Sequence, residues 1–364
     1  MKGLFINNSA AKDSIHESGR MVYNCLKISD KYQLDYIEVS IDNRSISKGY
    51  DFYFFNYHPV TMNWLNTCSL KKELGFSITM ILEVAPNDPF VFCPSRHFDA
   101  YCALDPTLKV KNKNVYAFPR PLEKIDFELP VINNGIPVIG TFGFATKGKG
   151  FQHVVEAVNK EFDKAIIKIN IPYGDFVPES KSYAEFLGNI CRSIAKPGIE
   201  VQISHDFMNK TDLIKWCANN TLNCFLYDRD IPGLSATTDQ AIVSERPLAV
   251  AKNETFRHIL EYLPPYPDCS LLDSISKSTP LVKQMKENWS AEKFIQKFEL
   301  LLSENEHLIS NHINNVNSVF ILPLRQKSII NTVVRRIKKY KRKLKKINLK
   351  TLSQNDTKRS KKII

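Results

Sequence analysis

A loop rich in glycine and lysine follows an apolar run near the middle of the chain, and its residue types are those that bind phosphate. The run spans Ile136 to Phe142, and the loop contains Gly143, Lys147, Gly148, Lys149 and Gly150. Glycines let the backbone approach an anion, a helix N-terminus presents free N–H groups, and a lysine adds a full charge. Because apolar residues then recur at helical spacing, the stretch predicts a strand, a phosphate-binding loop and a helix. The alternative is an ordinary turn with solvated lysines.

A second loop of similar chemistry follows another apolar run, Leu222 to Tyr227. It contains Asp228, Arg229, Asp230 and Gly233, and Ser235, Thr237, Thr238 and Asp239 then open a helix. An arginine can clamp a phosphate by paired hydrogen bonds, and a serine or threonine can cap the helix while its N–H groups face an anion. We expect the two loops to face each other around one ligand. Asp230 as a plain turn residue and Asp239 as a carboxylate that suits the helix dipole are the alternatives.

Two titratable side chains in the first half follow predicted strands, as functional groups do in parallel sheets. His58 is a candidate general base or acceptor ligand, since the pKa of histidine is near working pH without tuning. Glu83 is a second candidate base. The alternatives are a structural histidine and a capping or salt-bridged carboxylate.

Strands and helices alternate along the chain, which predicts parallel sheets with helices on both faces. The predicted strands of the first half are Gly3–Asn7, Gln33–Ser40, Asp51–Tyr57, Ser77–Val84, Tyr101–Leu104 and Val115–Phe118. Those of the second half are Ile136–Phe142, Ala165–Ile171, Ile199–Ile203, Leu222–Tyr227 and Pro247–Ala251.

The alternation is interrupted between residues 120 and 135, where two prolines, charges and an Asn-Asn-Gly turn predict a linker. We therefore expect one α/β domain over residues 1–125 and a second over residues 136–275, with a ligand cleft between them. Helices over residues 276–310, including the amphipathic stretch Ala291–Leu302, are expected to cross back over the first domain.

The chain has 364 residues and a net charge of +12, but the charge is concentrated at one end. Residues 325–364 contain 16 Lys+Arg and one acid, hence +15, which leaves −3 for the rest of the chain. A slightly acidic body argues against one that is wrapped in nucleic acid. The eight cysteines form no C-x-x-C motif, which favours a reducing, cytoplasmic setting without structural zinc.

The basic segment itself, residues 325–364, has apolar residues at helical spacing between its lysines and arginines. A basic amphipathic helix is typical of segments that lie on anionic membrane surfaces. Nucleic-acid binding would use the same charges, but Tyr340 is the segment's single aromatic residue, so base stacking is poorly supplied. A solvated, disordered tail is the third interpretation.

The two loops together resemble the donor-binding half of glycosyltransferases with the GT-B fold, the kind that makes bacterial surface polysaccharides. The matching residues are Gly140 with Lys149-Gly150, the loop Asp230-Ile231-Pro232-Gly233-Leu234, and Glu245-Arg246-Pro247-Leu248. The first half resembles the acceptor half through Ser18-Gly19-Arg20 and His58. Gln240 stands where the family has a second acidic residue, and Glu83 stands where a histidine is common.

The resemblance implies two Rossmann-like domains that face each other across a cleft, followed by the basic helical tail. It implies transfer of a sugar from a nucleotide-diphosphate sugar to a glycan or lipid-linked acceptor, in polysaccharide synthesis at the cytoplasmic face of a membrane. No cofactor, no metal and no nucleic-acid partner are expected. A non-catalytic nucleotide- or glycan-binding protein of the same shape is the alternative.

The resemblance also assigns roles to residues. The catalytic candidates are His58, Lys149 and Asp230, and those for acceptor binding are Gly19, Arg20 and Glu83. The donor-binding candidates are Gly143, Lys147, Gly150, Arg229, Gly233, Ser235, Thr237, Thr238 and Asp239.

Overall fold

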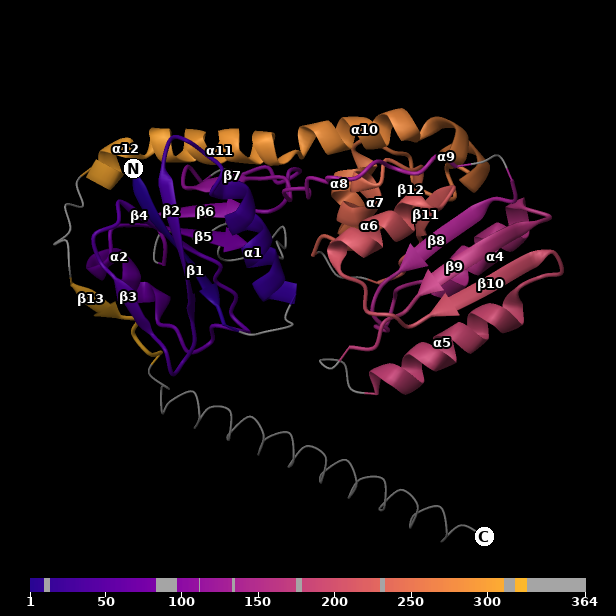
Figure 1. Ribbon diagram of the computed structural model, residues 1–364, viewed down its shortest axis with the longest axis horizontal. Coiled ribbons are helices and arrows are strands. Elements are labelled where there is room, and N and C mark those ends of the chain that lie inside the picture. Colours follow the sequence, from indigo (N-terminus) through magenta and orange to yellow (C-terminus); the bar gives the residue numbers. More distant parts are fainter. Residues whose placement is uncertain are drawn as a thin grey trace, which may run out of the picture.

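Two parallel β-sheets, one from each half of the chain, form the framework of the protein (Figure 1). The structure is a computed structural model, and it describes residues 1–9, 14–82, 97–110, 112–132, 135–174, 179–229, 233–310 and 318–325. Glu83, Asp230 and residues 326–364, and hence all of the predicted basic tail except Arg325, lie outside the described residues.

The N-terminal sheet has the strand order β2-β1-β4-β5-β6-β7, and all its pairs are parallel. Its strands are β1 (Lys2–Asn8), β2 (Gln33–Val39), β4 (Phe52–Phe55), β5 (Phe76–Ile81), β6 (Ala100–Ala103) and β7 (Val115–Ala117). The central strand β4 is buried throughout, as expected for a parallel strand covered on both faces.

Helices cover both faces of this sheet. On one face α1 (Ser14–Leu26) packs beside α11 (Ala291–Glu304) and α12 (Glu306–Ser310), and Phe294 and Phe298 of α11 enter the core. On the other face lie η1 (Thr67–Ser69), α2 (Leu70–Glu73) and a short ribbon of β3 (Ser45–Ser47) and β13 (Val319–Ile321). The first domain therefore includes residues from near both ends of the described chain.

The C-terminal sheet has the order β10-β9-β8-β11-β12 and is also parallel. Its strands are β8 (Val138–Phe142), β9 (Ala165–Asn170), β10 (Ile199–Ser204), β11 (Leu222–Phe225) and β12 (Leu248–Val250). In Figure 1 the arrowheads of β8 and β9 point toward the N-terminal domain, so the carboxyl ends of these strands face the space between the domains.

Two hydrophobic clusters cover the faces of the second sheet. One contains α4 (Phe151–Glu161), α5 (Ser180–Ile194) and α9 (Leu271–Lys277). The other contains α6 (Lys210–Ala218), α7 (Thr237–Val243), η3 (Glu254–Phe256), α8 (Arg257–Leu260) and α10 (Thr279–Asn288). Leu122, in the predicted linker, is buried in this second cluster, and its N–H donates to the Trp289 carbonyl oxygen at 3.1 Å. The predicted α/β fold with two Rossmann-like domains is confirmed.

A buried ion pair joins the two domains directly. The Arg257 guanidinium, at the start of α8, donates to Asp105 Oδ2 through Nε at 2.9 Å and Nη2 at 2.6 Å. Asp105 lies just after β6 of the N-terminal sheet and is buried. The pair fixes the first domain against the loop region of the second. None of the described helices is long and apolar enough to cross a membrane.

Candidate functional site

The two predicted loops lie against each other at the carboxyl ends of β8 and β11, and glycine makes the contact possible. Gly148 has φ +77°, and a Cβ placed there would lie 2.5 Å from Arg229 Cβ. Gly150 has φ +63°, and its Cβ would lie 1.8 Å from the Leu226 carbonyl oxygen. A side chain at either position would push the loops apart, so these glycines serve close backbone approach.

Lys149 points into the junction between the loops. Its Nζ donates to the Tyr227 hydroxyl at 3.0 Å and lies 4.4 Å from the centre of the Tyr227 ring. A Cβ on Gly143 would lie 3.4 Å from the same Nζ. Because glycine has no side chain, the space beside the Lys149 ammonium stays open on the side of the first loop. Lys147, two residues earlier, is exposed to solvent and makes no comparable contact among the described residues.

Tyr227 connects the first loop to the start of α7. Its hydroxyl lies 3.0 Å from Thr237 Oγ1, which in turn lies 2.7 Å from Ser235 Oγ. Burial acts to raise the pKa of Tyr227, but the charge of Lys149 and hydrogen bonds from Lys149, Thr237 and Ser235 outweigh it, and the pKa is lowered. The sequence analysis did not select Tyr227; its signal is a polar aromatic residue that ends an apolar run before a loop.

The expected capping of α7 was wrong. Ala236 is the N-cap residue and no side chain caps the helix. The hydroxyl groups make other hydrogen bonds instead. Thr238 Oγ1 donates to the Ser235 carbonyl oxygen at 2.9 Å, in the turn before the helix, and the hydroxyls of Ser235 and Thr237 bond to each other. The hydroxyl groups of Ser235 and Thr237 thus form a short hydrogen-bonded chain that leads to Tyr227 and Lys149.

Arg229 supplies a second cation beside Tyr227. Its guanidinium carbon lies 5.4 Å from the Tyr227 ring centre, and Nη2 donates to Thr255 Oγ1 at 2.9 Å. Thr255 Oγ1 also donates to the Gly233 carbonyl oxygen, which places Gly233 in the same network. The ring of Tyr227 therefore has the positive groups of Lys149 and Arg229 near it, an arrangement that favours an anionic ligand.

Asp239 lies on the buried side of α7, in an ion pair with a residue of the predicted linker. Arg120 Nε donates to Asp239 Oδ2 at 2.6 Å, and only 8 % and 5 % of the two side chains are exposed. Burial raises the pKa of Asp239, although the charge and hydrogen bond of Arg120 act in the opposite direction. Asp239 Oδ1 has no hydrogen-bond partner in the described part of the chain. The sequence analysis missed Arg120, because its position between two prolines predicted only a linker.

The buried side of α7 also touches a histidine that stays neutral. Thr238 Oγ1 lies 3.3 Å from His258 Nε2, and the imidazole stacks on Trp289 with ring centres 5.4 Å apart. Burial, together with the charges of Arg120 and Arg257, lowers the pKa of His258 to about 3. Thr238 therefore lies among core groups, whereas Thr237 faces the hydroxyl chain.

The N-terminal candidates lie at the carboxyl edge of their own sheet. A Cβ on Gly19 would lie 2.3 Å from Asn56 Nδ2 and 2.6 Å from Asn7 Oδ1, so this glycine lets α1 approach the ends of β1 and β4. His58 follows β4 and is half-buried, and its Nδ1 accepts from the Val60 N–H at 3.2 Å. These residues belong to the N-terminal domain, whereas Lys149 and Arg229 belong to the second domain.

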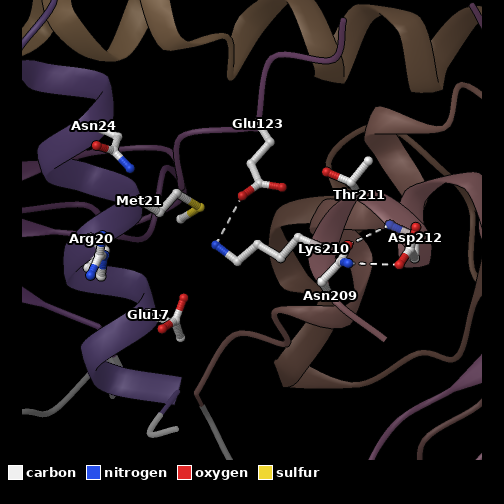
Figure 2. Close-up of a pocket in the computed structure, with 9 residues that line it drawn as sticks. All are labelled: Glu17, Arg20, Met21, Asn24, Glu123, Asn209, Lys210, Thr211 and Asp212. Carbon is white, nitrogen blue, oxygen red and sulfur yellow. Dashed lines mark hydrogen bonds and ion pairs between the residues drawn. The ribbon is translucent and has the colours of Figure 1, made fainter. Parts of the chain in front are cut away.

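A cleft of about 380 Å³ lies between the domains, lined by α1, the start of α6 and Glu123 (Figure 2). Arg20 of α1 is on its wall, and its side chain is exposed. Lys210 Nζ reaches across toward Glu123, 3.2 Å from Oε1. The lining is polar and contains acids, bases and amides, which suits a ligand rich in hydroxyl groups. The lining residues are Glu17, Arg20, Met21, Asn24, Glu123, Asn209, Lys210, Thr211 and Asp212.

Aromatic rings gather at the carboxyl ends of β8, β9 and β10. Phe144 and Phe207 have ring centres 6.4 Å apart, and Tyr173 stacks on His205 at 4.8 Å. Flat rings at a strand edge can stack on a planar or apolar ligand face. Within the described residues, no group of three His, Cys, Asp or Glu side chains could hold a metal ion.

The sequence matches no protein-family model, and no curated protein resembles it in sequence. Solved structures are similar in fold. HepE from Anabaena in complex with UDP-glucose superposes with a TM-score of 0.56 at 11 % identity, over 84 % of this chain and 100 % of that one. A glycosyltransferase from Rickettsia africae gives 0.54 at 13 %, over 86 % and 99 %. The lipopolysaccharide outer core galactosyltransferase WaaB gives 0.52 at 10 %, over 84 % and 100 %. Together with the two parallel sheets and the cleft between them, these likenesses show that the chain has the GT-B fold.

Proposed function

We propose that the protein is a glycosyltransferase that uses a nucleotide-diphosphate sugar as donor. The observation that carries the proposal is the placement of Lys149 and Arg229 around Tyr227, where two glycine-containing loops meet at the carboxyl edge of the second sheet. Proteins of the same fold were solved with UDP or UDP-glucose bound. A diphosphate with its negative charge fits this junction, and the aromatic rings beyond it suit the base.

The reaction places its greatest electrostatic demand on the leaving group. The bond between the sugar anomeric carbon and the phosphate oxygen breaks, and the acceptor hydroxyl oxygen bonds to the same carbon. The hydroxyl proton passes to a base, and the nucleoside diphosphate departs with the negative charge. Lys149 and Arg229 would stabilise that charge as fixed, preorganised groups. Such a mechanism obtains its positive charge from side chains and needs no metal ion.

The acceptor would occupy the cleft between α1 and α6. Its lining of amide, carboxylate and ammonium groups matches sugar hydroxyls, which both donate and accept hydrogen bonds. His58, at the carboxyl edge of the N-terminal sheet, is the proposed base. Arg20 of α1 is the proposed ligand of the acceptor. Asp230 and Glu83 remain candidates from the sequence alone. The acceptor is proposed to be a glycan or a lipid-linked sugar, in polysaccharide synthesis.

The proposed setting is the cytoplasmic face of a membrane. The charge of +15 over residues 325–364, against −3 for the rest of the chain, supports electrostatic attraction to anionic lipid. Free cysteines in both domains are compatible with a reducing compartment.

The test is a thermal-shift screen against UDP, GDP, CDP, ADP and their sugars, repeated on Lys149→Met. A ligand that binds only the folded state raises the melting temperature. Because Lys149 would contribute a charge-assisted hydrogen bond, its loss is expected to weaken nucleotide binding about tenfold to a hundredfold. Lys164→Met, which removes an exposed lysine between α4 and β9, is the matched control and is expected to bind like the wild type.

Release of nucleoside diphosphate from the bound sugar nucleotide, in the presence of candidate acceptors, then measures turnover. Nucleotide binding that Lys149→Met weakens to this extent, together with turnover on an acceptor, supports the enzyme. Binding without turnover on any acceptor would favour a non-catalytic binding protein instead. The absence of any stabilisation at millimolar nucleotide would remove the proposal's basis.

A further inference from the structure

A histidine of α4, His153, joins the two loops of the proposed donor site. Its Nε2 lies 3.1 Å from Asp228 Oδ2, on the second loop, and its Nδ1 lies 3.0 Å from Glu156 Oε2, one turn further along α4. A Cβ on Gly150 of the first loop would lie 3.2 Å from His153 Cδ2, so the imidazole also packs against that loop. His153 therefore contacts both loops at once.

Asp228, the partner of His153 on the second loop, lies between two residues of the proposed site. It follows Tyr227 directly and precedes Arg229, and its N–H donates to the Gly148 carbonyl oxygen of the first loop at 3.2 Å. The backbone of Asp228 is thus bonded to the first loop, and its side chain to α4. A shift of Asp228 would carry with it the Tyr227 phenol and the Arg229 guanidinium, the groups that lie beside one another in the site.

Each ring nitrogen of His153 faces a carboxylate, and this determines which form of the ring fits. An ionised carboxylate only accepts hydrogen bonds, and neutral imidazole has a single N–H to donate, whereas imidazolium has two. Protonated His153 can therefore bond to Glu156 and Asp228 together. Neutral His153 can bond to one of them and turns a lone pair toward the other.

A neighbouring amide indicates which hydrogen bond the neutral ring gives up. Gln152 Nε2 lies 3.5 Å from His153 Nε2, so the amide can donate to that nitrogen once it has lost its proton. Glu156 lies on the same helix, and its bond to Nδ1 can persist without any movement of the second loop. Loss of the proton is therefore expected to release Asp228.

The surroundings of the imidazole favour the protonated form. A cavity of about 350 Å³ lies beside His153, lined by Glu156 and Lys160 of α4 and by Tyr266 of the segment after α8, and the end of β12 contributes an alanine. Burial acts to lower the pKa of His153, but the hydrogen bonds and charges of Glu156 and Asp228 outweigh it, and the pKa is raised. Because 37 % of the side chain is exposed, the ring can exchange its proton with solvent.

We propose that His153 is a positioning residue whose protonated ring clamps the second loop to α4, so that the site binds a nucleotide-diphosphate sugar more tightly when the ring carries its proton. The clamp consists of His153, Glu156 and Asp228, and its effect on binding rests on the proposed function, which takes the junction of the two loops as the donor site. The clamp is complete below the ordinary pKa of histidine, about 6.5, and is lost as the pH rises through the raised pKa of the folded protein.

The first measurement is calorimetric titration of the full chain at pH 6 and pH 9 with UDP-glucose, or with whichever of the UDP, GDP, CDP and ADP sugars stabilises the protein most. A sugar nucleotide is the better probe, because it lacks the terminal phosphate of a free nucleotide, which changes its charge near pH 6. His153→Gln keeps a polar side chain that cannot carry a charge. We expect it to bind about twofold to fivefold more weakly than the wild type at pH 6, the effect of one partly exposed ion pair, and equally at pH 9.

A second variant guards against loss of folding as an explanation. His153→Arg keeps a permanent charge and donors for both carboxylates, so it is expected to match the wild type at pH 6 and to bind more tightly than the wild type at pH 9. His307→Gln, the same substitution on the exposed surface of α12 in the other domain, is the matched control and is expected to follow the wild type at both pH values.

Hydrogen exchange of the ligand-free protein tests the clamp without any nucleotide. The Asp228 amide is bonded to Gly148, so its protection reports whether the two loops stay together. Variants are compared at one pH at a time, which cancels the effect of pH on intrinsic exchange. At pH 6 the amide should exchange about twofold to fivefold faster in His153→Gln than in the wild type, and at pH 9 the two should exchange alike.

A difference between His153→Gln and the wild type that is the same at the two pH values would reduce His153 to a packing residue and overturn the proposal. Wild-type affinity and exchange of His153→Gln at pH 6 would also overturn it. The two proposals can fail separately. Exchange that follows the proton, with no binding of any sugar nucleotide, would refute the proposed function and the donor role of His153 but leave the clamp. Binding that depends on Lys149 but not on His153 would refute the present proposal alone.

Discussion

Replacing Arg120 by methionine tests whether the buried ion pair holds α7 and its carboxylate in place. The substitution keeps much of the apolar stem but removes the partner 2.6 Å from Asp239 Oδ2, in a pair of which 8 % and 5 % of the side chains are exposed. Breaking a buried pair from one side costs about 3–5 kcal/mol, because an uncompensated charge remains inside the protein. At about 2–4 °C per kcal/mol, the melting temperature at pH 8 is expected to fall by about 6–20 °C.

The same variant has a predictable pH dependence. Burial already raises the pKa of Asp239, and the loss of the opposing charge of Arg120 raises it further. A carboxyl whose folded-state pKa lies above its unfolded value of about 3.9 stabilises the fold at low pH and loses that contribution as the pH rises through the folded-state pKa. The deficit of Arg120→Met relative to the wild type should therefore shrink between pH 8 and pH 5, as Asp239 binds a proton.

Scanning calorimetry or dye-based melting at pH 5 and pH 8 measures both effects. Arg120→Met/Asp239→Asn removes both charges and is expected to recover most of the lost stability. Arg192→Met, on the exposed surface of α5, is the matched control and should melt within about 1–2 °C of the wild type. A deficit that is equal at the two pH values, or a double variant as unstable as the single one, would refute the argument that an unpaired buried carboxylate causes the loss.

Three further variants address the loops and the contact between domains. Gly150→Ala should lower the free energy of unfolding by about 2 kcal/mol or more and weaken nucleotide binding, since φ is +63° and the new Cβ would meet the Leu226 carbonyl oxygen. Gly135→Ala, with no atom within 4 Å of its Cβ, is the neutral control in the same thermal-melting assay. Tyr227→Phe should make nucleotide affinity less dependent on pH in the alkaline range than it is in the wild type, as measured by calorimetric titration. In the wild type, by contrast, the lowered pKa of Tyr227 lets a phenolate form, neutralise Lys149 and weaken binding as the pH rises. Arg257→Met should destabilise the junction between the domains by about 3–5 kcal/mol, because Asp105 stays buried without its partner; a melting curve that matches the wild type would contradict this.

Local patterns were sufficient to predict the two sheets. Each apolar run became a parallel strand, with bounds that differ by a few residues, because a strand buried on both faces needs a continuous hydrophobic stretch. β8 (Val138–Phe142) was predicted from its apolar run, and the loop after it from its glycines and lysines. β3 and β13 were not, because strands of three residues are too short for a periodic signal and their pairing joins residues far apart in the sequence.

The candidate site was predictable only in part, because its contacts depend on which strands are neighbours. The sequence indicated Lys149 and Arg229 as cations of two loops, but the tyrosine that lies between them could be identified only once β8 and β11 were adjacent. Arg120 was hidden in the same way: its partner Asp239 is 119 residues further along the chain. Glycine spacing indicates a loop, whereas a buried ion pair between remote segments leaves no pattern in either segment.

The return of α11 and β13 to the first domain has a consequence for the order in which the protein can fold during synthesis. The core of that domain contains Phe294 and Phe298 of α11 and Leu322 beyond β13, residues that leave the ribosome after the whole second sheet. The second domain has its strands and most of its covering helices by residue 288. Synthesis from the N-terminus would ordinarily complete the first domain first. Until α11 is synthesised, α1 covers that face of the N-terminal sheet without its partner helix, so the domain that is translated second is the first able to close its core.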